Sequence, residues 1–243
     1  MNFNEIIQRL RETRSVFHSE DDLKLAMAWA IGQLYPSFQV RLEKPIEIGM
    51  RLKDGDATAR APIDIVILDP VSRNAYPIEI KYKTKKAELQ VEGENYSLAN
   101  HGANLGARYG FRKDIYRVEN VYIENYEIKQ GFTFILTNDK AYYMNDVSSK
   151  NSLDAFFTFH HGAVLPKDYV GWNYANLAKD KYDFGLDQDV NPKLKRHWTL
   201  SKEYIYHLEL NKEYLIQWND YSNLQDNKGR SIDFKYCLVE VER

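Results

Sequence analysis

The sequence predicts a mixed α/β fold, and two observations support this prediction. The first 140 residues give the element order helix, three strands, helix and strand, read from the spacing of their apolar residues. Residues 203–242 then look like a few antiparallel strands, so the C-terminal part is expected to be β-rich. The simplest interpretation of the 243-residue chain is a core over 1–140 with an extension over 141–243 packed on it. Substrate binding is one role open to that extension.

Helical segments are expected at three places. A short amphipathic helix covers 4–14, and a clearer one begins after Ser19, which caps it, with Asp22 as the acidic partner of a capping box. A broad apolar stripe follows, as in a helix that packs on a core. A third helical stretch covers about 101–128, and we expect a break in it near Gly110.

Strands are expected over 38–48, 62–68, 76–82 and 131–139. The second of these is almost entirely apolar, which is typical of a strand buried on both faces. A short polar turn joins it to the third, and two short runs joined in this way predict an antiparallel hairpin. Residues 83–100 are polar and are assigned no element.

The bulk composition excludes several classes of protein. The net charge is −2 and the pI about 6.3, which argues against a protein that coats nucleic acid without specificity. A local basic cleft remains compatible with these values, because a field depends on where the charges lie. No apolar run approaches the roughly 20 residues of a membrane helix, and the N-terminus lacks a signal core. Cys237 is the single cysteine and is expected to be a buried thiol. We therefore expect a cytoplasmic protein without a membrane partner.

Two acidic residues lie inside otherwise apolar strands. Asp64 is flanked by two isoleucines, and so is Glu79. A buried carboxylate is costly unless it is paired or binds a metal, and two of them on adjacent strands of a hairpin can converge at one point. Strand alternation places Glu79 and Lys81 on one face and Ile80 on the other. A carboxylate and an ammonium are therefore expected to share one space.

Oxygen ligands of this kind suit Mg²⁺, which takes one or two carboxylates together with waters and substrate phosphate. Such an ion lowers the pKa of a bound water and offsets charge on a scissile phosphate. Lys81 would orient that water or stabilise the developing charge. The sequence therefore predicts a magnesium-dependent nuclease site, in which Mn²⁺ can replace Mg²⁺. The alternative is a structural ion pair between these acids and Lys81 or a nearby arginine.

The triplet of an acid, any residue and lysine is common and carries little weight alone. Only the triplet at 79–81 follows a strand that already has a central acid one hairpin upstream. The context therefore selects this triplet from the five in the chain, which are Asp22–Lys24, Glu79–Lys81, Glu127–Lys129, Asp226–Lys228 and Asp233–Lys235.

Asp64 followed by Glu79-Ile80-Lys81 resembles the signature of the PD-(D/E)XK nuclease superfamily. The element order of residues 19–137 is similar to the common core of that superfamily, a restriction-endonuclease-like αβββαβ fold with a mixed central sheet. The resemblance covers about half of the chain and identifies no subfamily. It implies that Asp64 and Glu79 bind magnesium, that Ile80 offers its backbone carbonyl, and that Lys81 serves catalysis. One departure is that Pro62 lies two residues before Asp64 instead of next to it.

The resemblance also implies an acid near the start of the first core helix. Glu20 is the matching candidate, with Asp21 and Asp22 as competitors. An acid in the first turn is favourable from the helix dipole alone, so a purely structural role for Glu20 stays open.

Basic residues near these positions are candidates for contact with a nucleic-acid backbone. Lys83 and Lys85 continue the face of Lys81 while the strand lasts, and Arg112 and Lys113 lie on the later helix. A solvated strand edge and a pairing within the helix are the alternatives.

The expected function is metal-dependent hydrolysis of phosphodiester bonds by an endonuclease, with DNA favoured over RNA, in restriction, phage defence or repair. The alternative is a catalytically inactive nuclease-like module that binds nucleic acid or assembles with protein. An enzyme acting on a small phosphorylated molecule has less support, because the chain lacks a phosphate-binding loop and a dinucleotide fingerprint. The oligomeric state is open, although a nuclease with one site often needs a homodimer to cut both strands.

Overall fold

The computed structural model describes residues 1–52, 55–101, 104–145, 152–173, 199, 201, 204 and 206–242. It confirms a mixed α/β fold with a six-stranded mixed sheet and few helices. Within these residues, no helix has the length and apolar character that a membrane crossing requires.

Apart from a hairpin within residues 87–98, the elements between residues 20 and 137 follow the predicted order of helix, three strands, helix and strand. The helices are α1 (Phe3–Thr13), α2 (Glu20–Leu34), α3 (Asn104–Asn120) and α4 (Lys140–Tyr143). The strands of the main sheet are β1 (Gln39–Leu52), β2 (Gly55–Asp69), β3 (Asn74–Lys83), β6 (Gln130–Thr137), β9 (Trp218–Gln225) and β10 (Ser231–Glu242). The remaining strands form two small sheets, namely β4 (Ala87–Val91) with β5 (Glu94–Leu98), and β7 (Val164–Leu165) with β8 (Tyr214–Leu215).

The main sheet has the strand order β1-β2-β3-β6-β10-β9. Strands β1, β2 and β3 form an antiparallel meander, which confirms the expected hairpin between β2 and β3. Strand β6 pairs with β3 in the parallel direction, and β10 and β9 return the sheet to antiparallel pairing. The C-terminal strands therefore complete the same sheet as the first part of the chain, while the division at residue 140 stays a prediction.

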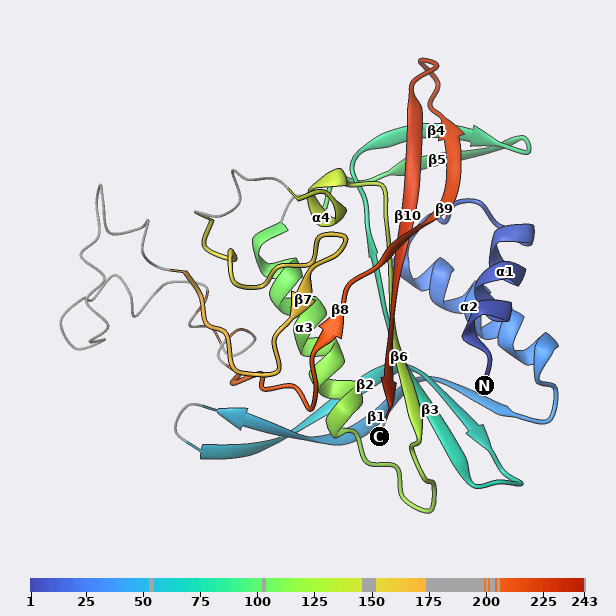
Figure 1. Cartoon of the computed structure of the whole chain (residues 1–243). Coiled ribbons are helices and arrows are strands. Elements are labelled where there is room, and N and C mark those ends of the chain that lie inside the picture. Colours follow the sequence, from blue (N-terminus) through green and yellow to red (C-terminus); the bar gives the residue numbers. More distant parts are fainter. Residues whose placement is uncertain are drawn as a thin grey trace.

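Helices cover both faces of this sheet (Figure 1). Helices α1 and α2 pack on one face, where their apolar residues meet Ile65, Ile78 and Phe134. Helix α3 packs on the opposite face, where it meets Val66 and Ile135 together with small elements of the C-terminal part. The alternation of β2 and β3 thus supplies side chains to both cores, as expected for strands buried on two sides.

The start of α2 follows the sequence closely. The Ser19 hydroxyl accepts a hydrogen bond from the Asp22 N–H at 3.1 Å, as predicted for the cap. The reciprocal bond differs, because the Asp22 carboxylate accepts from the N–H of His18, at 2.9 Å, and pairs with Arg14 at 2.7 Å. The first turn is therefore fixed to the preceding loop, which orients the acidic end of α2.

Two expectations from the sequence need correction. Helix α3 runs without interruption through Gly110, so the predicted break is wrong. A glycine costs a helix only about 1 kcal/mol, whereas Tyr109 and Phe111 on either side of it are buried and hold the helix on the sheet. The unassigned segment 83–100 contains the β4–β5 hairpin, whose turn at Glu92 and Gly93 has positive φ at both residues, as hairpin turns of this length require.

The backbone of Gly131 leaves no room for a side chain, which gives a test of the packing between α3 and β6. A Cβ at this position would overlap the Val118 side chain and lie 3.2 Å from the Pro77 carbonyl oxygen. We expect Gly131→Ala to lower the free energy of unfolding by about 1–3 kcal/mol, measured by urea denaturation. Gly110→Ala is the control, because no atom lies within 4 Å of its new Cβ, and it should be neutral or stabilise by up to about 1 kcal/mol. Equal effects of the two substitutions would contradict this packing.

Candidate functional site

The candidate site begins where β3 loses its β2 partner. The ladder between these strands ends at the Ile65–Ile78 pair, and the next residues along the two strands are Asp64 and Glu79. Backbone N–H groups freed on this edge of β3 still need acceptors. Asp64 Oδ2 accepts from the Ile80 N–H at 2.7 Å, and Glu20 Oε2 accepts from the Tyr82 N–H at 2.8 Å. Asp64 and Glu20 are therefore bound to the same edge of β3, at backbone N–H groups two residues apart.

Asp64 also faces two ammonium groups. Lys24, on α2, approaches Asp64 Oδ1 at 3.2 Å, and Lys81 approaches Asp64 Oδ2 at 3.9 Å. Burial disfavours the Asp64 anion, but Lys81 and the Ile80 N–H outweigh it and lower the pKa of Asp64 below its ordinary value. Asp64 is thus an ionised carboxylate between Lys24 and Lys81.

Glu79 lies deeper than Asp64, with an exposed fraction of 1%. Its Oε1 atom is 3.1 Å from a guanidinium nitrogen of Arg117 on α3, yet no described residue donates a hydrogen bond to it. Burial, together with the nearby Asp114 and Asp64 carboxylates, raises the pKa of Glu79 well above its ordinary value. The negative charge of Glu79 is therefore incompletely compensated by the protein.

Lys81 lies between the acids of the strands and an acid of α3. Its ammonium is 3.3 Å from Asp114 Oδ2 and donates to the Ile80 carbonyl at 3.0 Å. Burial opposes its charge, but Asp114, Asp64 and Glu79 outweigh burial and raise the pKa of Lys81 above its ordinary value. Glu79 and Lys81 both meet α3 whereas Ile80 packs toward α2, as strand alternation predicts.

Carboxylates outnumber cations in this cluster, which bears on whether a divalent cation fits it. No group of three or more His, Cys, Asp or Glu side chains among the described residues is arranged to hold a metal alone. Mg²⁺ needs fewer protein ligands, because waters and substrate phosphate complete its shell. Glu79 Oε1, which pairs with Arg117 but accepts no hydrogen bond, the adjacent Asp64 and the Ile80 carbonyl are the oxygens that could contribute to such a shell.

An identical triplet elsewhere in the chain shows what context contributes. Glu127-Ile128-Lys129 has the same three residues as the triplet at 79–81. Its two charged side chains are 66% and 61% exposed and pair with each other at 3.5 Å. Only the triplet on β3 brings its acid and its lysine into a buried cluster with other charges.

The four predicted nucleic-acid contacts lie in different surroundings. Lys83 is half-buried at the end of β3, and Lys85 is exposed and pairs with Asp139 at 3.1 Å. Lys113 places its ammonium over the Tyr206 ring, 4.8 Å from the centroid. Arg112 is fully buried and donates to four backbone carbonyls of the C-terminal part, those of Pro166, Lys167, Asp168 and Leu208. Arg112 therefore fixes that part to α3, and we remove it from the proposed nucleic-acid surface.

Sequence reasoning missed three members of the cluster, namely Lys24, Glu43 and Asp114. The signal for Lys24 was its spacing of four residues from Glu20, which puts both on one face of α2. Asp114 was expected to pair with Arg117, and it does so at 3.8 Å, but its contact with Lys81 is set by tertiary packing. No local pattern marked Glu43.

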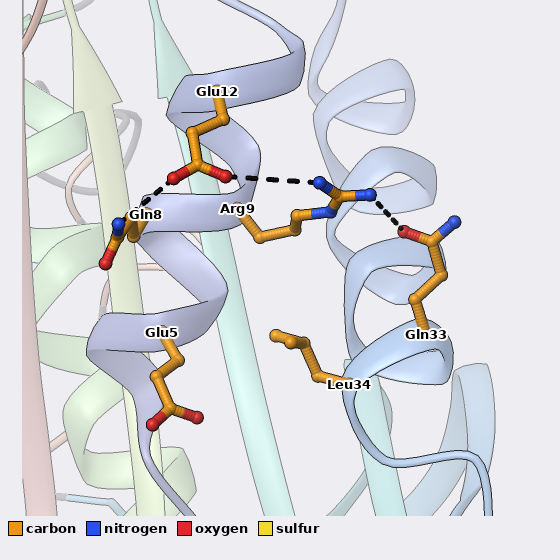
Figure 2. A pocket seen from close by; sticks show the side chains of 6 residues that line it. All are labelled: Glu5, Gln8, Arg9, Glu12, Gln33 and Leu34. Carbon is orange, nitrogen blue, oxygen red and sulfur yellow. Dashed lines mark hydrogen bonds and ion pairs between the residues drawn. The ribbon is translucent and has the colours of Figure 1, made fainter.

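A groove between α1 and α2 carries no comparable chemistry (Figure 2). Arg9 pairs with Glu12 of its own helix and donates to Gln33 of α2, so the arginine charge and one carboxylate of the groove are already paired. The groove reaches Leu34 at the C-terminal end of α2, whereas Glu20 and Lys24 lie at the opposite end of that helix.

Comparisons with protein-family models, with curated proteins and with solved structures found no match to this chain.

The raised pKa of Glu79 predicts how stability depends on pH. The folded protein holds this proton to higher pH than the unfolded chain, so the wild-type protein loses stability as pH rises above the ordinary glutamate pKa. Glu79→Gln removes the titrating carboxyl group, and with it this loss of stability at higher pH. We expect the stability of Glu79→Gln relative to wild type to increase from about pH 5 to about pH 8 in urea denaturation. The exposed Glu127→Gln should give a flat difference, and a Glu79→Gln difference that falls with pH would contradict the assignment.

Proposed function

We propose that this chain is a metal-dependent nuclease that hydrolyses phosphodiester bonds, with DNA as the favoured substrate. The observation that carries the proposal is the convergence of Asp64, Glu79 and Lys81 where β2 and β3 separate. Strand order supports it as well. An antiparallel β1-β2-β3 meander with β6 parallel to β3, and helices on both faces, is the arrangement expected of a restriction-endonuclease-like core.

Each residue of the site has a role in this proposal. Asp64, Glu79 and the Ile80 carbonyl would hold Mg²⁺ or Mn²⁺, which when bound supplies an acidified water and offsets charge on the phosphate. Glu20 holds the β3 edge through the Tyr82 N–H, and it is close enough to Lys81 to raise its pKa. Glu20 therefore contributes to the field of the site without touching Asp64.

Lys81 is a cation in this site. Four nearby carboxylates raise its pKa, so the side chain stays an ammonium at neutral pH and cannot accept a proton. It is suited to stabilise negative charge that develops on the phosphate, and Asp114 and the Ile80 carbonyl hold it in place. Lys83 and Lys85 follow it along the chain and would contact the nucleic-acid backbone on the way into the site.

One observation favours a second candidate function, a nuclease-like module that binds nucleic acid or protein without catalysis. Both acids of the site already face cations, Asp64 facing Lys24 and Glu79 facing Arg117. A purely structural ion-pair network would look similar. The Glu79 Oε1 atom supports the catalytic proposal, because it accepts no hydrogen bond and its ion pair with Arg117 does not keep the pKa of Glu79 at its ordinary value.

Plasmid cleavage with Mg²⁺ or Mn²⁺ tests the proposed function. Glu79→Ala and Lys81→Ala should each lower the rate by at least about 100-fold, because the first removes a metal ligand and the second a cation beside the phosphate. Glu127→Ala and Lys129→Ala are matched controls from the identical exposed triplet and should cleave as wild type does.

Cleavage that survives the substitutions on β3 would show that the site lies elsewhere. Absence of both cleavage and Mn²⁺ binding at millimolar concentration would favour the module. The homodimer remains a proposal, and the order of nicking and linearisation tests it, because a dimer should cut both strands in one encounter.

A further inference from the structure

We infer that Lys24 is a resident counter-ion that a divalent cation must displace from Asp64, so that metal binds weakly until nucleic acid is present. This inference rests on the proposed function. It concerns the affinity of the site for metal and can be measured without cleavage.

Lys24 lies almost completely within the cluster, with 8% of its side chain exposed. Its ammonium contacts three carboxylates, at 3.3 Å from Asp21, at 3.2 Å from Asp64, and in a close ion pair with Glu43. The three carboxylates are not arranged to hold a metal ion by themselves, and the Lys24 ammonium neutralises part of their charge.

The backbone of Glu43 indicates that this contact is built into the fold. Glu43 lies within β1 with φ of +50°, a region that costs energy for a residue with a Cβ. The β1–β2 register pairs Leu42 with Ile65 and Lys44 with Ile63 but omits the pair between them, which would be Glu43 with Asp64. The strand thus gives up a ladder pair and adopts a strained backbone at the residue whose side chain meets Lys24.

Electrostatics make Lys24 and a metal ion competitors for Asp64. A divalent cation bound to Asp64 would lie within a few ångströms of the ammonium, where like charges repel strongly in a buried site. The Lys24 ammonium has an alternative position beside Asp21 and Glu43. Their side chains are 91% and 49% exposed and form the outer edge of the cluster. The ammonium can keep these two partners while it leaves Asp64.

Nucleic acid would shift this competition. A phosphate entering the site adds negative charge for both cations, so the metal and the displaced ammonium no longer compete for the same carboxylates. The inferred consequence is ordered assembly, in which substrate raises metal affinity and metal raises substrate affinity by the same factor.

Mn²⁺ binding to the full chain without nucleic acid tests the inference, by calorimetry or by electron paramagnetic resonance of free Mn²⁺. Lys24→Met keeps an unbranched apolar side chain, one atom shorter than that of lysine, and removes its charge. We expect it to bind Mn²⁺ at least about tenfold more tightly than wild type. Lys235→Met is the matched control, because Lys235 pairs with a single carboxylate, Asp220, at 2.5 Å on the β9–β10 edge, and its Kd should equal that of wild type.

Glu43→Gln provides a second variant of opposite sign that does not depend on the folding of Lys24→Met. With one outer carboxylate neutralised, Lys24 should hold Asp64 more firmly and Mn²⁺ should bind more weakly. In the Lys24→Met background most of that effect should vanish, because it acts through Lys24.

The outcomes separate the two proposals. Equal or weaker Mn²⁺ binding by Lys24→Met, with binding by wild type intact, would overturn the inference alone and make Lys24 a support for Asp64. Absence of Mn²⁺ binding in wild type and in both variants would overturn the proposed function together with the inference.

Discussion

The separation of β2 from β3 is the constraint on which the rest of the site depends. Past Ile78, the edge of β3 keeps its backbone N–H groups but loses the strand that would accept from them. Asp64 accepts from the N–H of Ile80, and Glu20 accepts from the N–H of Tyr82. The next N–H on this edge, that of Thr84, donates to His101 Nδ1. Because buried N–H groups must be paired, the fold needs polar side chains at this edge. It thereby gathers acids at the place where the pairing of β2 with β3 ends.

Burial then determines what these acids can do. Glu79 is covered by α3 and has a raised pKa, whereas Asp64 remains ionised between Lys24 and Lys81. The identical triplet at residues 127–129 lies in solvent, where its two charges only meet each other. The triplet of acid, any residue and lysine is a weak pattern in the sequence alone. On β3 it lies buried beside a second acid, where charge–charge interactions are stronger than in water.

The sequence predicted the parts of this arrangement that local patterns control. The order of the first elements follows from apolar spacing and capping, and strand alternation correctly placed Glu79 and Lys81 on one face. Local sequence patterns could not predict the partners that tertiary packing brings to the site. Arg112 looked like a surface base but is buried on backbone carbonyls, because the C-terminal part folds over α3. Glu43 has a positive φ and pairs with Lys24 from another element, and neither feature is marked in the local sequence.

The central claim is that a divalent cation binds between Asp64 and Glu79. A crystal of the protein soaked in Mn²⁺, measured at a wavelength where manganese scatters anomalously, tests it most directly. The account predicts an anomalous peak within coordination distance of Asp64 and Glu79 carboxylate oxygens, at about 2.0–2.6 Å as for hard divalent cations, with the Lys24 ammonium withdrawn from Asp64. A peak elsewhere on the molecule, or continued contact of Asp64 with Lys24 in a crystal saturated with Mn²⁺, would contradict it.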